Sequence, residues 1–126
     1  MKIAIVGTSH LTVEEHVKAA KAINDIISEG DTVISGGAKG IDQLAVCVAR
    51  DRECGIDIRL PVIDEWKGYK PRNQEIAEAC DVLYCITTKT KTESCYHCVM
   101  DHQRTGGCWT MKYAKSQGKK VELIVI

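Results

Sequence analysis

The chain has 126 residues, a length that fits one domain spanning 1–126. Its 17 basic and 17 acidic side chains cancel, which argues against bulk electrostatic attraction to nucleic acid or to an anionic membrane. The sequence shows neither a signal-peptide pattern nor an apolar run of membrane-spanning length. We therefore expect a cytoplasmic protein whose seven cysteines are thiols or metal ligands rather than disulfides.

Strand-like and helix-like segments alternate along the chain. Short β-branched runs predict strands at 2–7, 32–35, 57–62, 81–86 and 121–126. Helices are predicted from the Thr12 capping box to Gly30, from about Gly40 to before Gly55, from Pro71 and from about Gly107. The apolar face of the first helix is predicted to hold Val13, Val17, Ala20, Ile23 and Ile27. This alternation predicts an α/β fold, a Rossmann-like three-layer sandwich with a parallel sheet of about five strands.

Glycine-rich and polar segments follow the predicted strands. Ligands of such sheets bind beyond the carboxyl ends of the strands, where glycines let backbone N–H groups approach an anion. Lys39 and Arg72 would add cationic donors, and Asp42 would either hold a ribose hydroxyl or only favour the start of its helix. We therefore predict a site for a phosphate-bearing ligand, formed by Gly7, Ser9, Gly36, Gly37, Lys39, Gly40, Asp42, Arg72, Asn73, Gly106 and Gly107.

Two motifs resemble a known superfamily. SGGAKGID, followed downstream by PRNQEIAEACDVLYCI, resembles the core of the SLOG superfamily, named for the Smf/DprA and LOG proteins. Its DprA branch has a similar loop ending in Gly-Ile-Asp and a similar Arg-Asn before a helix. Its LOG branch has Pro-Gly-Gly-x-Gly-Thr-x-x-Glu after the fourth strand. Gly106, Gly107 and Thr110 agree with that motif, which adds Thr110 to the expected ligand site, but Tyr113 stands where the catalytic glutamate would be.

Three functions remain open. The resemblance implies first a module that binds or senses a nucleotide or phosphorylated nucleotide derivative, without a required cofactor and as a homo-oligomer. A LOG-like nucleoside monophosphate phosphoribohydrolase is the alternative, with Glu65, Asp42 or His10 in place of the missing glutamate. DprA-like binding of single-stranded DNA is the second alternative. The zero net charge makes nucleic acid an unlikely partner, although Trp66 and Tyr69 could stack on a base.

An insertion loop at about 87–105 carries cysteines and a histidine. Cys95, Cys98, His102 and Cys108 form C-x2-C-x3-H-x5-C, a set that can close a tetrahedral zinc site. A long loop inside a compact domain favours such a staple. Alternatively, Cys108 faces the ligand or the core. The remaining cysteines are predicted to be small hydrophobic side chains: Cys47, Cys54, Cys80 and Cys85.

Overall fold

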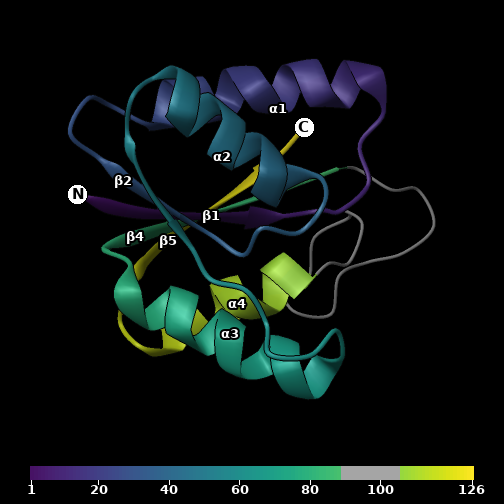
Figure 1. The fold of residues 1–126 in the computed structure, drawn as a ribbon, viewed down its shortest axis with the longest axis vertical. Helices are drawn as coiled ribbons and strands as arrows, with labels where there is room; N and C mark the ends of the chain where they lie inside the picture. The colour runs from purple at the N-terminus through teal and green to yellow at the C-terminus, as the bar shows by residue number, and fades with distance from the viewer. Residues whose placement is uncertain (89–105) are drawn as a thin grey trace.

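The computed structural model describes residues 1–88 and 106–126, which form a five-stranded parallel sheet with helices on both faces (Figure 1). The strands are β1 (Lys2–Gly7), β2 (Thr32–Ser35), β3 (Gly55–Ile58), β4 (Val82–Thr87) and β5 (Lys120–Val125). The helices are α1 (Val13–Ile26), α2 (Ile41–Asp51), α3 (Trp66–Ala79) and α4 (Gly106–Ser116). The predicted Rossmann-like α/β class is confirmed.

The strand order β3-β2-β1-β4-β5 places β1 at the centre of the sheet. β1 pairs in parallel with both β2 and β4, so that Ile3 lies beside Val33 and Val82. The chain builds outward from β1 to β3 on one side and from β4 to β5 on the other. The order therefore reverses between β1 and β4, and a ligand cavity is expected at the carboxyl ends of these strands.

Two apolar cores hold the layers together. α1 and α2 cover one face of the sheet, where Ile5, Ile23 and Ile41 are fully buried (Figure 1). α3 and α4 cover the other face, where Ile34 and Leu83 are fully buried. Full burial of each such side chain contributes roughly 1.5–3 kcal/mol. These contacts fix the first turns of α3 and α4 near the carboxyl edge of the sheet.

The buried stripe of α1 differs from the predicted one. Ala19, Ile23 and Ile27 are buried, whereas Val13 and Val17 are 85% and 65% exposed. The helical period places Ala19, Ile23 and Ile27 on one line along the helix, and Val13 and Val17 lie away from that line. The spacing of apolar residues therefore identified the helix correctly but included two residues that do not pack.

The third strand lies earlier than predicted. β3 ends at Ile58, and Gly55, expected to lie past the end of a helix, is its first residue beside Thr32. The Arg59 N–H still donates to the Ser35 carbonyl oxygen at 2.8 Å. Pro61 has no N–H to extend this pairing, so the chain leaves the sheet here.

Helix α3 begins five residues before the predicted start at Pro71. Glu65 is its extended N-cap residue, and the Tyr69 N–H donates to the Glu65 carbonyl oxygen at 2.9 Å. Pro71 consequently lies inside the helix, to which it supplies no N–H. The additional first turn carries Trp66 and Tyr69 to the carboxyl edge of the sheet.

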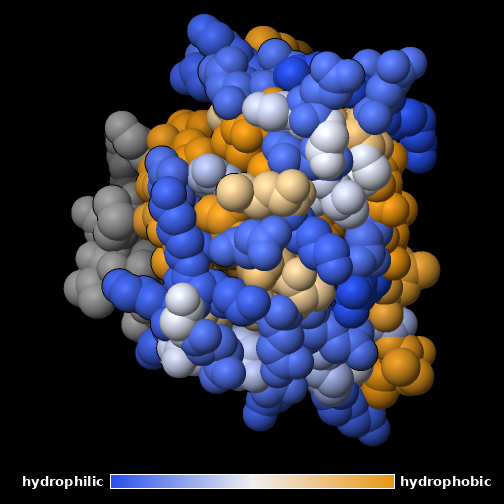
Figure 2. All heavy atoms as spheres, turned by 90° about the vertical axis from the view of Figure 1, so that its left-hand side faces the viewer, coloured by the Kyte–Doolittle hydropathy of each residue, from blue (hydrophilic) through white to orange (hydrophobic). Residues whose placement is uncertain are grey.

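The opposite edge, where the strands begin, has a mainly hydrophilic surface (Figure 2). Within residues 1–88 and 106–126, no helix combines the length and apolar character needed to cross a membrane.

Candidate phosphate-binding cavity

A cavity of about 670 Å³ lies at the carboxyl edge of the sheet. Its walls come from the loops after β1, β2 and β3, from the first turn of α2, and from α3 and α4. Ligand pockets commonly have volumes of roughly 300–1,000 Å³, so a nucleotide unit fits. The cavity brings together most of the residues predicted for the ligand site: Gly7, Ser9, Gly36, Gly37, Asp42, Arg72, Asn73, Gly107 and Thr110.

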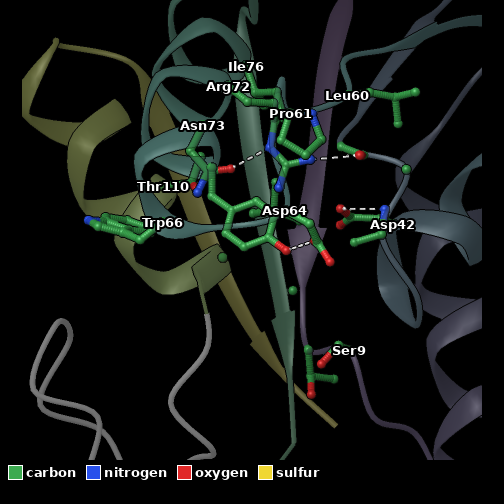
Figure 3. A pocket seen from close by; sticks show the side chains of 18 of the residues that line it. Ser9, Asp42, Leu60, Pro61, Asp64, Trp66, Arg72, Asn73, Ile76 and Thr110 are labelled. Atoms are coloured by element: carbon green, nitrogen blue, oxygen red, sulfur yellow. Dashed lines mark hydrogen bonds between the residues drawn. The ribbon is translucent and has the colours of Figure 1, made fainter.

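Arg72 is the cationic side chain in the described lining, and it is held in place before any ligand binds. Its Nε donates to Asn73 Oδ1 at 2.8 Å, and its Nη1 donates to the Gly36 carbonyl oxygen at 2.7 Å. The guanidinium lies over the ring of Tyr69, 5.5 Å from its centre. The third nitrogen, Nη2, points into the cavity (Figure 3). A guanidinium fixed in this way is suited to receive an oxyanion.

Asp42 is a buried carboxyl group close to this guanidinium. Asp42 lies in the first turn of α2, and its Oδ2 accepts a hydrogen bond at 3.3 Å from the N–H of Ala38 in the loop after β2. Burial raises the pKa of Asp42 from 3.8 to about 6, although the charge of Arg72 and the bond from Ala38 act in the opposite direction. Burial likewise lowers the pKa of Arg72, and the charge of Asp42 opposes that shift. The first turn of α2 thus supplies the loop after β2 with an internal anion, beside the cavity.

The amides of this loop are less available than the glycine pattern predicts. The Gly37 N–H donates to Ser35 Oγ at 3.2 Å, and the Ala38 N–H is bonded to Asp42. A Cβ on Gly36 would lie 2.5 Å from Arg72 Nη1 and 2.8 Å from Asp42 Oδ2. Gly36 is therefore required by the packing of charged side chains against the loop backbone.

Three predicted site residues are not among the described residues that line the cavity: Lys39, Gly40 and Gly106. Lys39 is exposed. Gly40 has φ +78°, and a Cβ on it would lie 2.4 Å from the Thr8 carbonyl oxygen. A glycine is therefore needed here for the loop after β2 to pack against the loop after β1. Gly106 is the first residue of α4, and a Cβ on its neighbour Gly107 would lie 2.7 Å from the Gly7 nitrogen.

The loop after β3 contributes side chains that the glycine pattern does not reveal. Leu60, Pro61 and Asp64 line the cavity together with Trp66 and Tyr69. The Tyr69 hydroxyl donates to the Asp64 carboxylate (Figure 3). A sequence signal for this wall existed, because the segment follows a predicted strand and must reach the same edge of the sheet.

Of the side chains predicted as possible acid or base groups for LOG-like hydrolysis, some line the cavity and one does not. Asp42 and His10 line the cavity, whereas Glu65 is the N-cap residue of α3. Tyr113 is not among the described lining residues, and its hydroxyl donates to Glu78 Oε1 at 2.8 Å. This bond and the nearby charge of Glu78 raise the pKa of Tyr113. LOG-like hydrolysis therefore stays a prediction, without a carboxylate from α4.

Three of the four residues of the predicted zinc cluster lie outside the described residues: Cys95, Cys98 and His102. Cys108 is buried in the α3–α4 core, with its Sγ 3.9 Å from that of Cys85. Residues 1–88 and 106–126 contain no group of three metal-ligating side chains close enough to hold an ion. Zinc at the four-residue cluster stays a prediction. Of the cysteines predicted to be buried, the structure buries Cys54, Cys80 and Cys85 but exposes Cys47.

Residues 1–56 match the family model of DNA recombination-mediator protein A. The solved structure of DNA processing protein A (DprA) from Helicobacter pylori has a TM-score of 0.72 and 16% sequence identity, covering 98% of this chain and 64% of that one. The fold is DprA-like. The solved structure of DprA from Streptococcus pneumoniae also has a TM-score of 0.72, with 17% sequence identity, and the match covers 97% of this chain and 49% of that one. This chain thus spans less than two thirds of either protein. No curated protein matches it.

These matches confirm the resemblance to the SLOG superfamily through its DprA branch and correct one expectation. The inference that nucleic acid is an unlikely partner is wrong, because the Helicobacter pylori protein with this fold is described by its single-stranded DNA binding mode. The error lay in using net charge, which averages over the whole surface. A single guanidinium in a cavity can bind a phosphate in a chain of zero net charge. Homo-oligomerisation and a cytoplasmic location stay predictions.

Proposed function

We propose that this chain binds single-stranded DNA and that one backbone phosphate enters the cavity beside Arg72. The observation that carries this proposal is the fixed guanidinium, two of whose nitrogens are bonded to Asn73 and Gly36 while the third points into the cavity. The DprA-like fold and the family match of residues 1–56 support DNA as the source of the phosphate.

The geometry favours a phosphate bound by few but well-oriented donors. Arg72 is 9% exposed and already ordered by its neighbours, so binding costs little side-chain entropy. Hydrogen bonds from a charged donor to phosphate are short and strong, which makes one such contact effective. Gly7 and Gly107, whose backbones pack closely against each other, line the same space.

A single strand suits this cavity better than a duplex. An unpaired nucleotide can rotate about its backbone and direct its phosphate inward, whereas paired and stacked nucleotides hold their phosphates on the outside of a rigid rod. The cavity volume of about 670 Å³ accommodates one nucleotide unit rather than a helix.

The test compares one substitution at a cavity-lining residue with one at an exposed residue outside the described lining. Arg72→Lys keeps the charge but loses the fork, and Lys39→Ala removes a charge from an exposed residue outside the described lining. Binding of a labelled oligo(dT) is measured by fluorescence anisotropy. We expect Arg72→Lys to weaken binding roughly 10- to 100-fold, the value of one charged hydrogen bond, and Lys39→Ala to change it less than about twofold.

Thermal unfolding of each variant accompanies the binding measurement, because Arg72 also supports the Gly36 carbonyl. Wild-type affinity in a folded Arg72→Lys variant would contradict the proposed phosphate position. Competition with excess thymidine monophosphate separates a strand from a small ligand. We expect weak competition, and binding of the monophosphate as tight as that of oligo(dT) would favour a nucleotide-binding module instead.

A further inference from the structure

Trp66 places an open aromatic surface at one side of the cavity. Its side chain is 49% exposed although it is among the largest apolar groups in the chain. In Figure 3, Trp66 and Asp42 lie on opposite sides, with Arg72 between them. The cavity therefore offers a cationic centre and, to one side of it, an apolar plane. That combination matches the phosphate and base of a nucleotide.

The indole of Trp66 is held by neighbouring aromatic rings. Trp109 on α4 meets it edge to face, with ring centres 5.1 Å apart and planes at 88°. Trp109 in turn stacks on Tyr113, with ring centres 5.6 Å apart and an interplanar angle of 2°. The Tyr113 hydroxyl is anchored on Glu78 of α3. Aromatic pairs in such arrangements contribute beyond their buried area, so the exposed ring is ordered before a ligand arrives.

Tyr69, the other aromatic residue of this wall, has its contacts within the protein. Its ring lies under the guanidinium of Arg72, and its hydroxyl is bonded to Asp64. Use of this ring for a ligand would disturb the fixed guanidinium. Among residues 1–88 and 106–126, Trp66 supports no charged group in this way, and about half of its surface is open.

We propose that Trp66 is a stacking surface for a nucleobase of the strand whose phosphate meets Arg72. This stacking role rests on the proposed binding of single-stranded DNA and adds how the base is held. Stacking on an aromatic face tolerates every base, because each base has a π surface. Stacking on Trp66 would therefore favour any nucleotide that carries a base, without distinguishing one base from another.

The experiment uses an oligonucleotide from which the bases are absent. Oligo(dT) is compared with an abasic strand of the same length and phosphate number, on the wild type and on Trp66→Ala, Trp66→Phe and Val62→Ala. Val62 is 96% exposed in the loop just before α3 but is not among the described lining residues, so it is the matched control. Trp66 and Trp109 are the two tryptophans of the chain, which makes intrinsic fluorescence a direct second readout.

We expect the wild type and Val62→Ala to prefer oligo(dT) over the abasic strand, and oligo(dT) to quench their tryptophan fluorescence. Trp66→Ala should bind oligo(dT) roughly 5- to 150-fold more weakly, with affinity for the abasic strand unchanged, and Trp66→Phe should keep part of the preference. Equal wild-type affinities for the two strands, or a preference that survives in Trp66→Ala, would overturn the stacking role and leave the phosphate site intact. Absence of binding to either strand would overturn both.

Discussion

The two sides of the cavity are built on opposite principles. On the β2–α2 side, the loop amides of Gly37 and Ala38 are bonded to Ser35 and Asp42 inside the protein. On the α3 side, polar and aromatic side chains contact protein groups on one side and the cavity on the other. Arg72, for example, is bonded through Nε and Nη1 to Asn73 and Gly36, while its Nη2 points into the cavity.

This difference changes where recognition is expected. A glycine-rich loop in a parallel α/β fold is usually taken as the anion site. Here Asp42 supplies an internal anion to that loop, and Gly36 allows Arg72 and Asp42 to approach the backbone between them. The loop therefore positions the guanidinium, and in our proposal it is this guanidinium of α3, rather than the loop amides, that contacts the phosphate.

Gly36→Ala should have the largest effect, because it disturbs both sides at once. The new Cβ would lie 2.5 Å from Arg72 Nη1 and 2.8 Å from Asp42 Oδ2, so both side chains must move. We expect a loss of roughly 1–3 kcal/mol in the free energy of unfolding and at least tenfold weaker oligo(dT) binding. Denaturant unfolding and anisotropy measure the two effects.

Gly118→Ala is the control for this substitution. Gly118 has φ +79° with nothing within 4 Å of an added Cβ, so only backbone strain of about 1 kcal/mol is introduced. This variant should bind oligo(dT) normally. Normal binding by Gly36→Ala as well would show that the position of Arg72 against the loop does not matter for the ligand.

Asp42→Asn tests the internal anion through pH. The pKa of Asp42 is raised to about 6 in the folded protein, so the native state holds this proton more tightly than the unfolded chain. The stability from this group is full below its unfolded value of 3.8 and is lost as the pH rises through about 6, by about 3 kcal/mol in total. Unfolding from pH 4 to 7 should therefore show a smaller decline in Asp42→Asn than in the wild type.

The same variant changes binding in a defined direction. A neutral side chain at 42 leaves the charge of Arg72 uncompensated, so we expect Asp42→Asn to bind oligo(dT) more tightly at pH 7.5. Wild-type affinity should approach that of the variant as the pH falls below about 6. Parallel pH profiles of the wild type and the variant would show that a group other than Asp42 governs the pH dependence.

Salt dependence should give the smallest effect. One or two phosphates neutralised on a single strand give a logarithmic slope of about −0.7 to −1.4, or roughly three- to sevenfold weaker binding between 50 and 200 mM salt. Anisotropy titrations in that range measure it. A much steeper slope would place several phosphates on exposed lysines, such as Lys67 or Lys120, and not in the cavity.

Local sequence patterns predicted the parts of the fold that local forces determine. β1 and β2 have the predicted bounds, and the capping box of Thr12 and Glu15 is present. The start of α3 was missed because Pro71 is favourable in a first turn, whereas the chain begins this helix at Trp66.

The site was predictable as a location and less so in its contacts. The rule that ligands bind at carboxyl ends of strands correctly brought Gly7, Gly36, Arg72 and Gly107 to one cavity. The pattern could not show that Asp42 would bond to the Ala38 amide four residues earlier. That bond depends on how the loop folds back onto the first turn of α2, which residue spacing alone does not specify.

A crystal structure of the chain with a short oligo(dT) tests the central claim most directly. We predict a backbone phosphate within hydrogen-bonding distance of Arg72 Nη2, with the Asp42–Ala38 bond retained. A strand bound elsewhere, or a phosphate held by the β2–α2 loop amides with Asp42 displaced, would contradict it.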